Sequence, residues 1–125
     1  MNELEEKTAE NTETNLTNAL NYGARDEVAR ATKLLAKDGA LGLLDPDNVN
    51  EESIPKYLDT RVLPDPDLVI RTSGEARISN FLLWQSAYAE YEFVDTLWPD
   101  FSREEFASLC ASYGNRDRRF GGVKK

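Results

Sequence analysis

Two arginines and a serine lie close together around a short turn in the stretch IRTSGEARISN. Arg71 and Arg77 stand on either side of Ser73-Gly74, and Ser79 follows them. Guanidinium groups are permanently charged planar forks that match phosphate oxygens in bidentate geometry. A turn that leads into a helix also offers backbone N–H groups and a partial positive dipole. These residue types together predict a pocket for a diphosphate group.

Two carboxylates flank this cluster. Glu75 follows the turn, and Glu90 lies at the end of the next amphipathic stretch. Carboxylates beside a diphosphate commonly hold a magnesium ion, which keeps several waters and takes one or two protein ligands. The same spacing also fits a simpler interpretation, in which Arg71 and Arg77 form surface ion pairs with Glu75 or with other exposed acids. Spacing alone leaves both interpretations open.

The composition limits the classes of function. The chain has 125 residues, of which 40% are hydrophobic and 30% charged, and this fits a single domain. A net charge of −8 argues against a general nucleic-acid-binding protein, although it leaves room for a local basic pocket. With one cysteine and no histidine, the chain has no disulfide framework and no histidine-based zinc or nucleophile site. Cys110 itself is expected to be buried.

The N-terminal segment carries no targeting signal that we recognise. Its sequence is acidic and polar, unlike a signal peptide, and no apolar run approaches the roughly 20 residues of a membrane span. We therefore expect a cytoplasmic protein. Residues 1–14 also lack an apolar stripe, which predicts a helical or disordered arm that cannot anchor a core.

The apolar pattern of the first half predicts two strands joined by helices. Residues 16–20 read as a short half-buried strand, and residues 25–37 as an amphipathic helix with Gly39 as its C-terminal cap. Residues 50–58 are expected to form a short helix before a proline cluster. The apolar run DLVIRT, residues 67–72, is typical of a parallel strand buried on both faces. Strand, helices and strand make a βαβ crossover.

The second half is predicted to contain two further helices and a third strand. Aromatic residues recur at helical spacing over residues 81–88, and Ser79 is placed to cap that helix. Residues 91–93 alternate as a strand. A capping box opens a final helix at Ser102, which is expected to run towards the basic residues 116–119. The sequence thus predicts an α/β fold, with a partial parallel sheet and flanking helices.

Three segments match one known family in order and spacing. The longest runs from Pro64 to Phe101 and contains RTSGEARISNFLLWQ, while LNYGAR precedes it and RRFGG follows it. Together they resemble the signature of the cis-prenyltransferases, the undecaprenyl diphosphate synthase family. The resemblance covers residues 15–122, between the arm at 1–14 and a tail at 123–125. It implies the C-terminal half of the cis-prenyltransferase fold.

The resemblance implies an activity and a set of site residues. The family condenses isopentenyl diphosphate with an allylic diphosphate such as farnesyl diphosphate, using magnesium, and makes cis-polyprenyl diphosphate lipid carriers for cell-wall synthesis. The implied substrate-binding residues are Arg71, Arg77, Ser79, Arg119 and Gly121, with Ser73, Gly74, Glu75 and Asn80 in support and Glu90 at the magnesium. Arg119 and Gly121 would belong to an Arg-x-Gly element that reaches the active site across a dimer interface. Glu27, at an acidic position of the family, would have a structural role or would support the residues that touch the substrate, whereas by default a glutamate there is a surface acid favoured by the helix dipole.

The sequence also departs from the family pattern. Ala24 and Asp26 stand where a glycine and a tryptophan are usual, and Glu92 replaces an aromatic residue. Family members are longer, and their N-terminal half carries a Met-Asp-Gly-Asn-type motif whose aspartate binds magnesium and the allylic diphosphate. These 125 residues contain no such motif. We therefore expect an isopentenyl diphosphate half-site without activity of its own.

The expected partners follow from the same resemblance. They are isopentenyl diphosphate, farnesyl diphosphate only together with the other half of the fold, and a second copy or a full-length subunit. The lipid product would also allow peripheral contact with a membrane. Two alternatives stay open, namely a non-catalytic partner subunit of a heteromeric prenyltransferase and an inactive gene remnant. Retention of Arg71, Arg77 and Ser79 favours the enzyme, because a pure partner has little reason to keep them.

Overall fold

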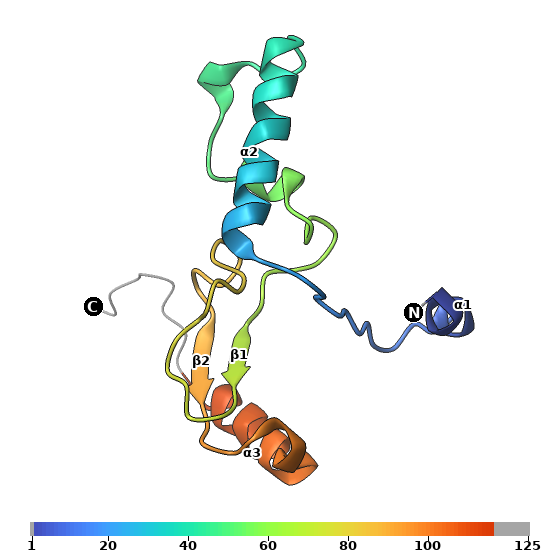
Figure 1. The fold of residues 1–125 in the computed structure, drawn as a ribbon, viewed down its shortest axis with the longest axis vertical. Coiled ribbons are helices and arrows are strands. Elements are labelled where there is room, and N and C mark those ends of the chain that lie inside the picture. The colour runs from blue at the N-terminus through green and yellow to red at the C-terminus, as the bar shows by residue number, and fades with distance from the viewer. Residues whose placement is uncertain (1, 117–125) are drawn as a thin grey trace.

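A small parallel sheet with a helix at each end forms the body of the chain (Figure 1). The computed structural model describes residues 2–116. The strands are β1, Leu68–Arg71, and β2, Glu90–Phe93, and the helices are α1, Asn2–Thr8, α2, Ala24–Ala40, and α3, Arg103–Gly114. Short 3-10 turns lie in the connections, at η1, Pro46–Asn48, η2, Ile54–Tyr57, and η3, Trp98–Asp100.

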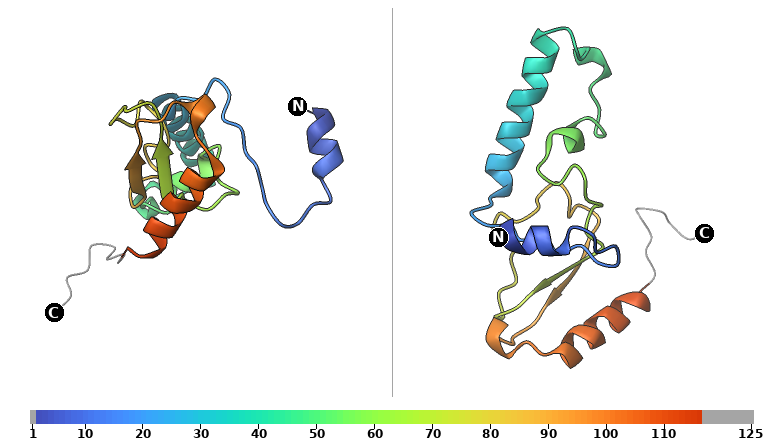
Figure 2. Two further views of the ribbon diagram at one scale, coloured as in Figure 1. Left: turned by 90° about the horizontal axis from the view of Figure 1, so that it is seen from below. Right: turned by 90° about the vertical axis from the view of Figure 1, so that its right-hand side faces the viewer.

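The N-terminal arm runs away from this body. Figures 1 and 2 show α1 set apart from the sheet, at the end of an extended stretch that leads to α2. The strand predicted over residues 16–20 is wrong, since that segment is irregular and the side chains of Leu16 and Leu20 are 86% and 71% exposed. A strand needs a neighbour for its backbone hydrogen bonds, and this segment has none in the sheet. The βαβ crossover built on it is wrong for the same reason.

Helix α2 is the longest element and confirms the helix predicted over residues 25–37. It continues to Ala40, so Gly39 lies inside the helix and the C-terminal cap is Leu41. Its buried positions are Ala24, Glu27 and Ala31, a stripe that packs against η2. The helix predicted at residues 50–58 is only the 3-10 turn Ile54–Tyr57, flanked by further turns. Its Tyr57 hydroxyl donates to the Asp38 carboxylate of α2 at 2.8 Å.

The sheet contains the strands predicted at residues 67–72 and 91–93. They pair in parallel, with Leu68 opposite Glu90 and Arg71 opposite Phe93. The prediction that β1 is buried on both faces is wrong, because all four of its residues are half-buried. The pair has no further strand within residues 2–116 to cover it.

The connection between the two strands, residues 72–89, consists of turns and bends. The helix predicted over residues 81–88 is therefore wrong. Ser79, Asn80 and Leu82 all have positive φ values, of 46°, 61° and 47°, and a right-handed helix cannot pass through that region. Asn80 instead bonds to the start of α2, so a long-range contact overrides the helical spacing of the aromatic residues.

Helix α3 begins as its capping sequence predicts. The Ser102 hydroxyl accepts a hydrogen bond from the backbone N–H of Glu105 at 3.1 Å. The Glu105 carboxylate accepts from the Thr96 hydroxyl at 2.8 Å. The helix ends at Gly114, earlier than predicted, and Asn115 is its C-terminal cap. Cys110 is exposed on this helix, so the prediction of a buried cysteine is wrong.

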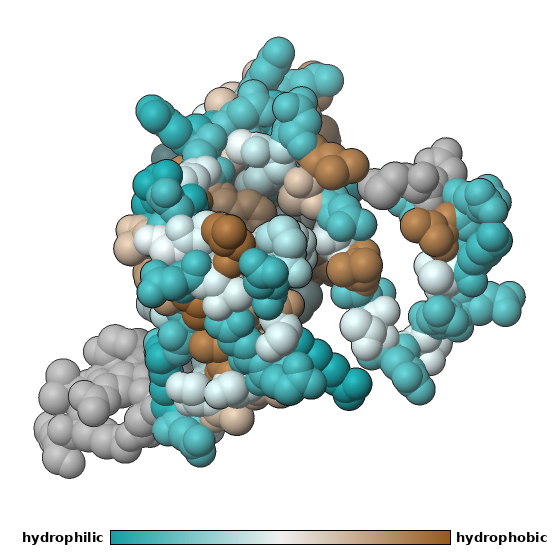
Figure 3. All heavy atoms as spheres, turned by 60° about the horizontal axis from the view of Figure 1, so that its bottom comes forward, coloured by the Kyte–Doolittle hydropathy of each residue, from teal (hydrophilic) through white to brown (hydrophobic). Residues whose placement is uncertain are grey.

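The apolar core is small. Within residues 2–116 the buried hydrophobic side chains are Ala24, Ala31 and Leu58. The chain exposes 10276 Å², against roughly 6,700 Å² for a folded domain of this size. Figure 3 shows brown apolar residues scattered between teal polar ones on one face. No helix in the part of the chain that the structure describes is long and apolar enough to cross a membrane.

The cap of α3 gives a stability prediction. Replacing Ser102 with alanine leaves an N–H of the first turn without its side-chain acceptor, and we expect the free energy of unfolding to fall by about 1 kcal/mol. Urea unfolding followed by circular dichroism measures this change. Ser108→Ala, at an exposed position in the same helix, is the matched control and should leave stability within about 0.5 kcal/mol of the wild type. Equal effects of the two substitutions would contradict the capping role.

Candidate functional site

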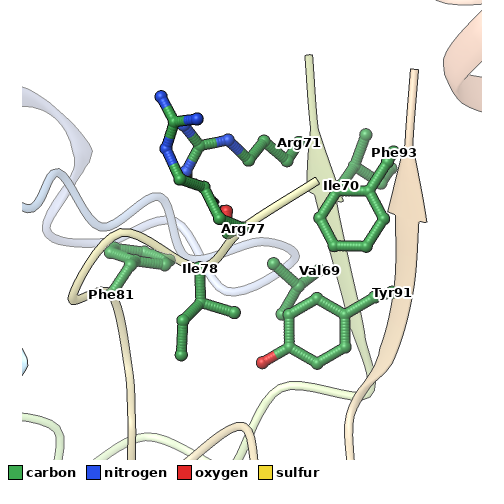
Figure 4. Close-up of a pocket in the computed structure, with 8 residues that line it drawn as sticks. All are labelled: Val69, Ile70, Arg71, Arg77, Ile78, Phe81, Tyr91 and Phe93. Carbon is green, nitrogen blue, oxygen red and sulfur yellow. Dashed lines mark hydrogen bonds between the residues drawn. The ribbon is translucent and has the colours of Figure 1, made fainter. Parts of the chain in front are cut away.

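A small pocket lies between the sheet and the connection that follows β1. Its volume is about 140 Å³. It is lined by Val69, Ile70, Arg71, Arg77, Ile78, Phe81, Tyr91 and Phe93. Figure 4 shows the two arginine head groups together on one side of the pocket, with the aliphatic and aromatic side chains on the other. The pocket thus joins an apolar interior to a positively charged rim.

Arg71 stands at the carboxyl end of β1, where ligands usually bind in open α/β sheets. Its guanidinium donates a hydrogen bond to the backbone carbonyl of Arg77 at 2.6 Å, which ties the strand to the connection. Within residues 2–116 no carboxylate forms an ion pair with Arg71. A guanidinium has five N–H donors, so most of them stay free to bind an anion.

Arg77 lies beside Arg71 and forms an ion pair with Glu75. Its side chain is 66% exposed, so solvent weakens this pair. The two arginines therefore differ in their contacts. Arg77 makes the surface ion pair of the simpler interpretation, whereas Arg71 keeps a charge that no described carboxylate neutralises.

The Ser73-Gly74 turn extends the strand pairing. The N–H of Ser73 donates to Thr96 and the N–H of Gly74 to Val94, both at 2.9 Å. These two amides are thus engaged inside the chain and do not point at an anion. Gly74 has a φ of 67°, and a Cβ on it would lie 3.0 Å from the Asp95 carboxylate, so this position requires glycine.

The next two predicted residues, Ser79 and Asn80, lie beyond the pocket lining. Both are exposed. Asn80 accepts hydrogen bonds from the first N–H groups of α2, through its side chain to Arg25 and through its carbonyl to Ala24. The structure therefore places Arg71 and Arg77 side by side, whereas Asn80 caps the start of α2. Arg119 and Gly121 lie outside the described residues.

Glu90 lies at the other end of the sheet. It pairs with Leu68 in the parallel register, three residues before Arg71, a separation of about 10 Å along the strand. Its carboxylate forms an ion pair with Arg116 at 2.9 Å, and Arg116 also pairs with Glu92. Nowhere in residues 2–116 do three Cys, Asp or Glu side chains gather as a metal site requires. Within those residues no cation site is therefore built from protein ligands alone.

A buried carboxylate lies in α2, where the default interpretation from the helix dipole predicts a surface acid. Glu27 is 1% exposed, which overturns its default interpretation as a surface acid. It accepts hydrogen bonds from the Tyr22 hydroxyl at 2.5 Å, the Asp59 N–H at 2.9 Å and the Gln85 amide at 3.0 Å. Its position in the apolar stripe of α2, between Ala24 and Ala31, is the signal that could have found it.

The carboxylate also changes the ionisation of its partner. Burial, and then the hydrogen bond to the Glu27 carboxylate, raise the pKa of Tyr22 to about 12. The Tyr22 ring also packs edge-on against Phe81, with ring centroids 5.7 Å apart. The network therefore joins the start of α2 to a residue that lines the pocket.

A comparison with protein families identifies the family of this chain. The prenyltransferase family model for undecaprenyl diphosphate synthases matches residues 1–121. The chain belongs to the undecaprenyl diphosphate synthase family. The family predicted from the sequence is thus confirmed.

Individual relatives agree with the family. The isoprenyl transferase of Agrobacterium fabrum is 54% identical over 123 residues, which cover 98% of this chain and 50% of that protein. The chain thus spans about half the length of the curated relatives it matches.

Solved structures show the same fold. The probable undecaprenyl diphosphate synthase of Campylobacter jejuni superposes with a TM-score of 0.76 and 39% identity, over 96% of this chain and 53% of that one. Lavandulyl diphosphate synthase from Lavandula x intermedia, in complex with dimethylallyl diphosphate, gives a TM-score of 0.79 and 38% identity, over 82% of this chain and 44% of that one. The predicted α/β class of the cis-prenyltransferases is confirmed.

The raised pKa of Tyr22 predicts a loss of stability at high pH. Its folded pKa lies above the ordinary value of 10.0, so between pH 10 and 12 the unfolded chain loses this proton while the folded chain keeps it. The free energy of unfolding should therefore fall as the pH rises through this window. Urea unfolding at pH 9, 10.5 and 11.5 measures the slope.

Two variants make the comparison specific. Tyr22→Phe should fall less steeply with pH than the wild type, because it has no proton to lose at this position. Phe106→Leu, at a side chain that is 50% exposed and carries no titratable group, should follow the wild-type slope. Parallel slopes for the wild type and Tyr22→Phe would show that the hydroxyl does not ionise as described.

Proposed function

We propose that this chain supplies the isopentenyl diphosphate half-site of a prenyltransferase. That enzyme would condense isopentenyl diphosphate with an allylic diphosphate, farnesyl diphosphate, to a cis-polyprenyl diphosphate lipid carrier. The observation that carries the proposal is the position of Arg71. Its charge has no counter-ion within residues 2–116, and it lies beside Arg77 at the rim of an apolar pocket.

The pocket suits both parts of this substrate. An apolar cavity of roughly 150 Å³ can hold a molecule as large as benzene, so about 140 Å³ is room for a five-carbon isopentenyl group. The two guanidinium groups at the rim would then bind the diphosphate. The Glu75 carboxylate would keep the Arg77 side chain in place until the anion competes for it. Ser79 would add a hydroxyl donor after a small movement of its exposed turn.

The proposed chemistry joins the two substrates directly. The isopentenyl double bond attacks the allylic carbon, the allylic diphosphate leaves with the electron pair of the broken bond, and the isopentenyl unit loses a proton. The residues of this chain would bind and orient isopentenyl diphosphate, which accepts the allylic group. Holding the reacting atoms in register in this way contributes to catalysis. Stabilising the departing diphosphate needs a second set of charges, and the Met-Asp-Gly-Asn-type motif that supplies it in the family is absent from these 125 residues.

The proposed cofactor is magnesium, which would neutralise the diphosphates when bound. Glu90 could serve it as one ligand among substrate oxygens and waters, the usual coordination of this ion. It would have to exchange its ion pair with Arg116 first. Arg119 and Gly121 are proposed to act on the diphosphate of a neighbouring subunit, as the family's Arg-x-Gly element implies.

The proposed assembly is a homodimer or a complex with a full-length subunit. The exposed apolar residues support association, because a monomer rarely leaves so many uncovered. Examples are Leu41, Leu43, Val62, Leu97 and Trp98, each more than half exposed. We place the assembly in the cytoplasm, with its lipid product as the contact to a membrane. The same surfaces keep the alternative of a non-catalytic partner subunit open.

Removal of Arg71 tests the proposed half-site. Loss of one bidentate guanidinium should weaken isopentenyl diphosphate binding by about 1.5 to 3 kcal/mol. Isothermal titration calorimetry on the wild type and Arg71→Ala, with and without magnesium, measures this. Arg103→Ala, an exposed arginine at the start of α3, is the matched control and should bind as the wild type does. Equal affinities of all three proteins would refute the site.

Turnover by the chain alone is a separate test. We expect no polyprenyl product when the 125-residue chain is incubated with radiolabelled isopentenyl diphosphate, farnesyl diphosphate and magnesium, because the allylic diphosphate lacks its binding motif. Thin-layer chromatography of the extracted lipids reports the product. A radiolabelled cis-polyprenyl diphosphate would show that these residues hold both substrates.

A further inference from the structure

Helix α2 begins without a cap of its own. Gly23 occupies its N-cap position and has no side chain to accept from the first N–H groups. Asn80, 55 positions beyond Arg25, supplies what is missing. Its side-chain oxygen accepts from the Arg25 N–H and its backbone carbonyl from the Ala24 N–H, both at 2.9 Å. The helix is therefore capped by the connection between the strands.

The glycine at position 23 is explained by this contact. Its φ of −149° and ψ of 120° are extended values that any residue adopts, so the backbone does not require glycine. A Cβ at this position, however, would lie only 3.0 Å from the side-chain nitrogen of Asn80. The absence of a side chain at position 23 thus makes room for a cap that comes from elsewhere.

The capping residue adjoins the wall of the pocket in the sequence. Asn80 lies between the lining residues Ile78 and Phe81, three positions after Arg77. Its φ of 61° is left-handed, a conformation that asparagine tolerates better than most residues. In Figure 1 the connection between β1 and β2 reaches the first turn of α2, where these hydrogen bonds form. The helix end and the pocket wall are therefore held by the same residue.

We propose that Asn80 is a positioning residue for the diphosphate pocket. By capping α2 from a distance it fixes the stretch that carries Arg77, and the guanidinium then lies beside that of Arg71. This inference rests on the proposed function of the pocket. It adds that Asn80 contributes to the affinity for the diphosphate without touching the substrate. Gly23 is needed because its lack of a side chain leaves room for the Asn80 cap.

Three variants separate positioning from helix stability. Asn80→Ala removes the side-chain bond to the Arg25 N–H and leaves the carbonyl bond to the Ala24 N–H. In Asn80→Ala/Gly23→Ser the new serine can cap α2 locally, so the helix regains a side-chain acceptor while the connection keeps only its carbonyl bond to the Ala24 N–H. Gly23→Ser alone reaches the same state by another route, because the added Cβ displaces the Asn80 side chain and the serine replaces it as the cap. The full 125-residue chain is used throughout.

Thermal unfolding and calorimetric titration with isopentenyl diphosphate and with inorganic pyrophosphate are the measurements. Asn80→Ala should unfold a few degrees lower than the wild type. The double variant and Gly23→Ser should unfold near the wild-type temperature and still bind both ligands about tenfold more weakly, since a displaced binding group loses most of its contribution. Asn115→Ala, which removes an asparagine near the end of α3, is the control and should keep full affinity.

Arg71→Ala in the same series separates this inference from the proposed function. If Arg71→Ala weakens binding while the two serine-capped proteins bind as tightly as the wild type, Asn80 is a helix cap only and the inference is wrong. If Arg71→Ala binds as the wild type does, the pocket itself is wrong. Weak binding by both serine-capped proteins at wild-type stability supports the positioning role.

Discussion

The hydrogen bonds between the first turn of α2 and the connection after β1 hold this structure together. Few apolar side chains are buried, so packing alone joins the elements weakly. Polar contacts join them instead, because Asn80 caps the helix and the buried Glu27 carboxylate receives three donors. A buried carboxylate is tolerated only when it is hydrogen-bonded in this way. The Gln85 amide donates to Glu27 and to Thr60 and thereby ties three segments together, although no described residue donates to its own oxygen.

The sheet built on this frame has two chemically different ends. At the carboxyl end of β1, two guanidinium groups face an apolar pocket. At the amino end of β2, carboxylates predominate, and Arg116 from the end of α3 neutralises Glu90 and Glu92. This separation suits the binding of an amphiphilic anion, whose charged part meets cations while its hydrocarbon part meets aromatic rings. The chain is acidic as a whole and still carries two arginines side by side at this pocket.

The sequence predicted the elements whose signals are local. The helix at α2 follows from its apolar stripe, the start of α3 from Ser102, and the two strands from short apolar or alternating runs. Prediction from the sequence failed where a contact with a distant segment determines the local structure. The aromatic spacing over residues 81–88 indicates a helix, but Asn80 bonds to α2 instead. The apolar stripe of α2 places Glu27 on the buried face, but its hydrogen-bond donors Tyr22, Asp59 and Gln85 could not be read from that pattern. Of the site, the pairing of Arg71 with Arg77 was foreseeable, whereas the engaged amides of Ser73 and Gly74 were not.

The two-stranded sheet has a consequence for how the chain behaves among other polypeptides. Within residues 2–116 each strand has a neighbouring strand on one side only. The backbone N–H and C=O groups on the outer edge of both strands therefore have no partner strand among these residues. Such edges accept a further strand from any extended segment, with little regard for its side chains. The same geometry that lets a proper partner enlarge the sheet also lets identical molecules stack into aggregates. Which of the two prevails depends on how soon after synthesis these edges are paired.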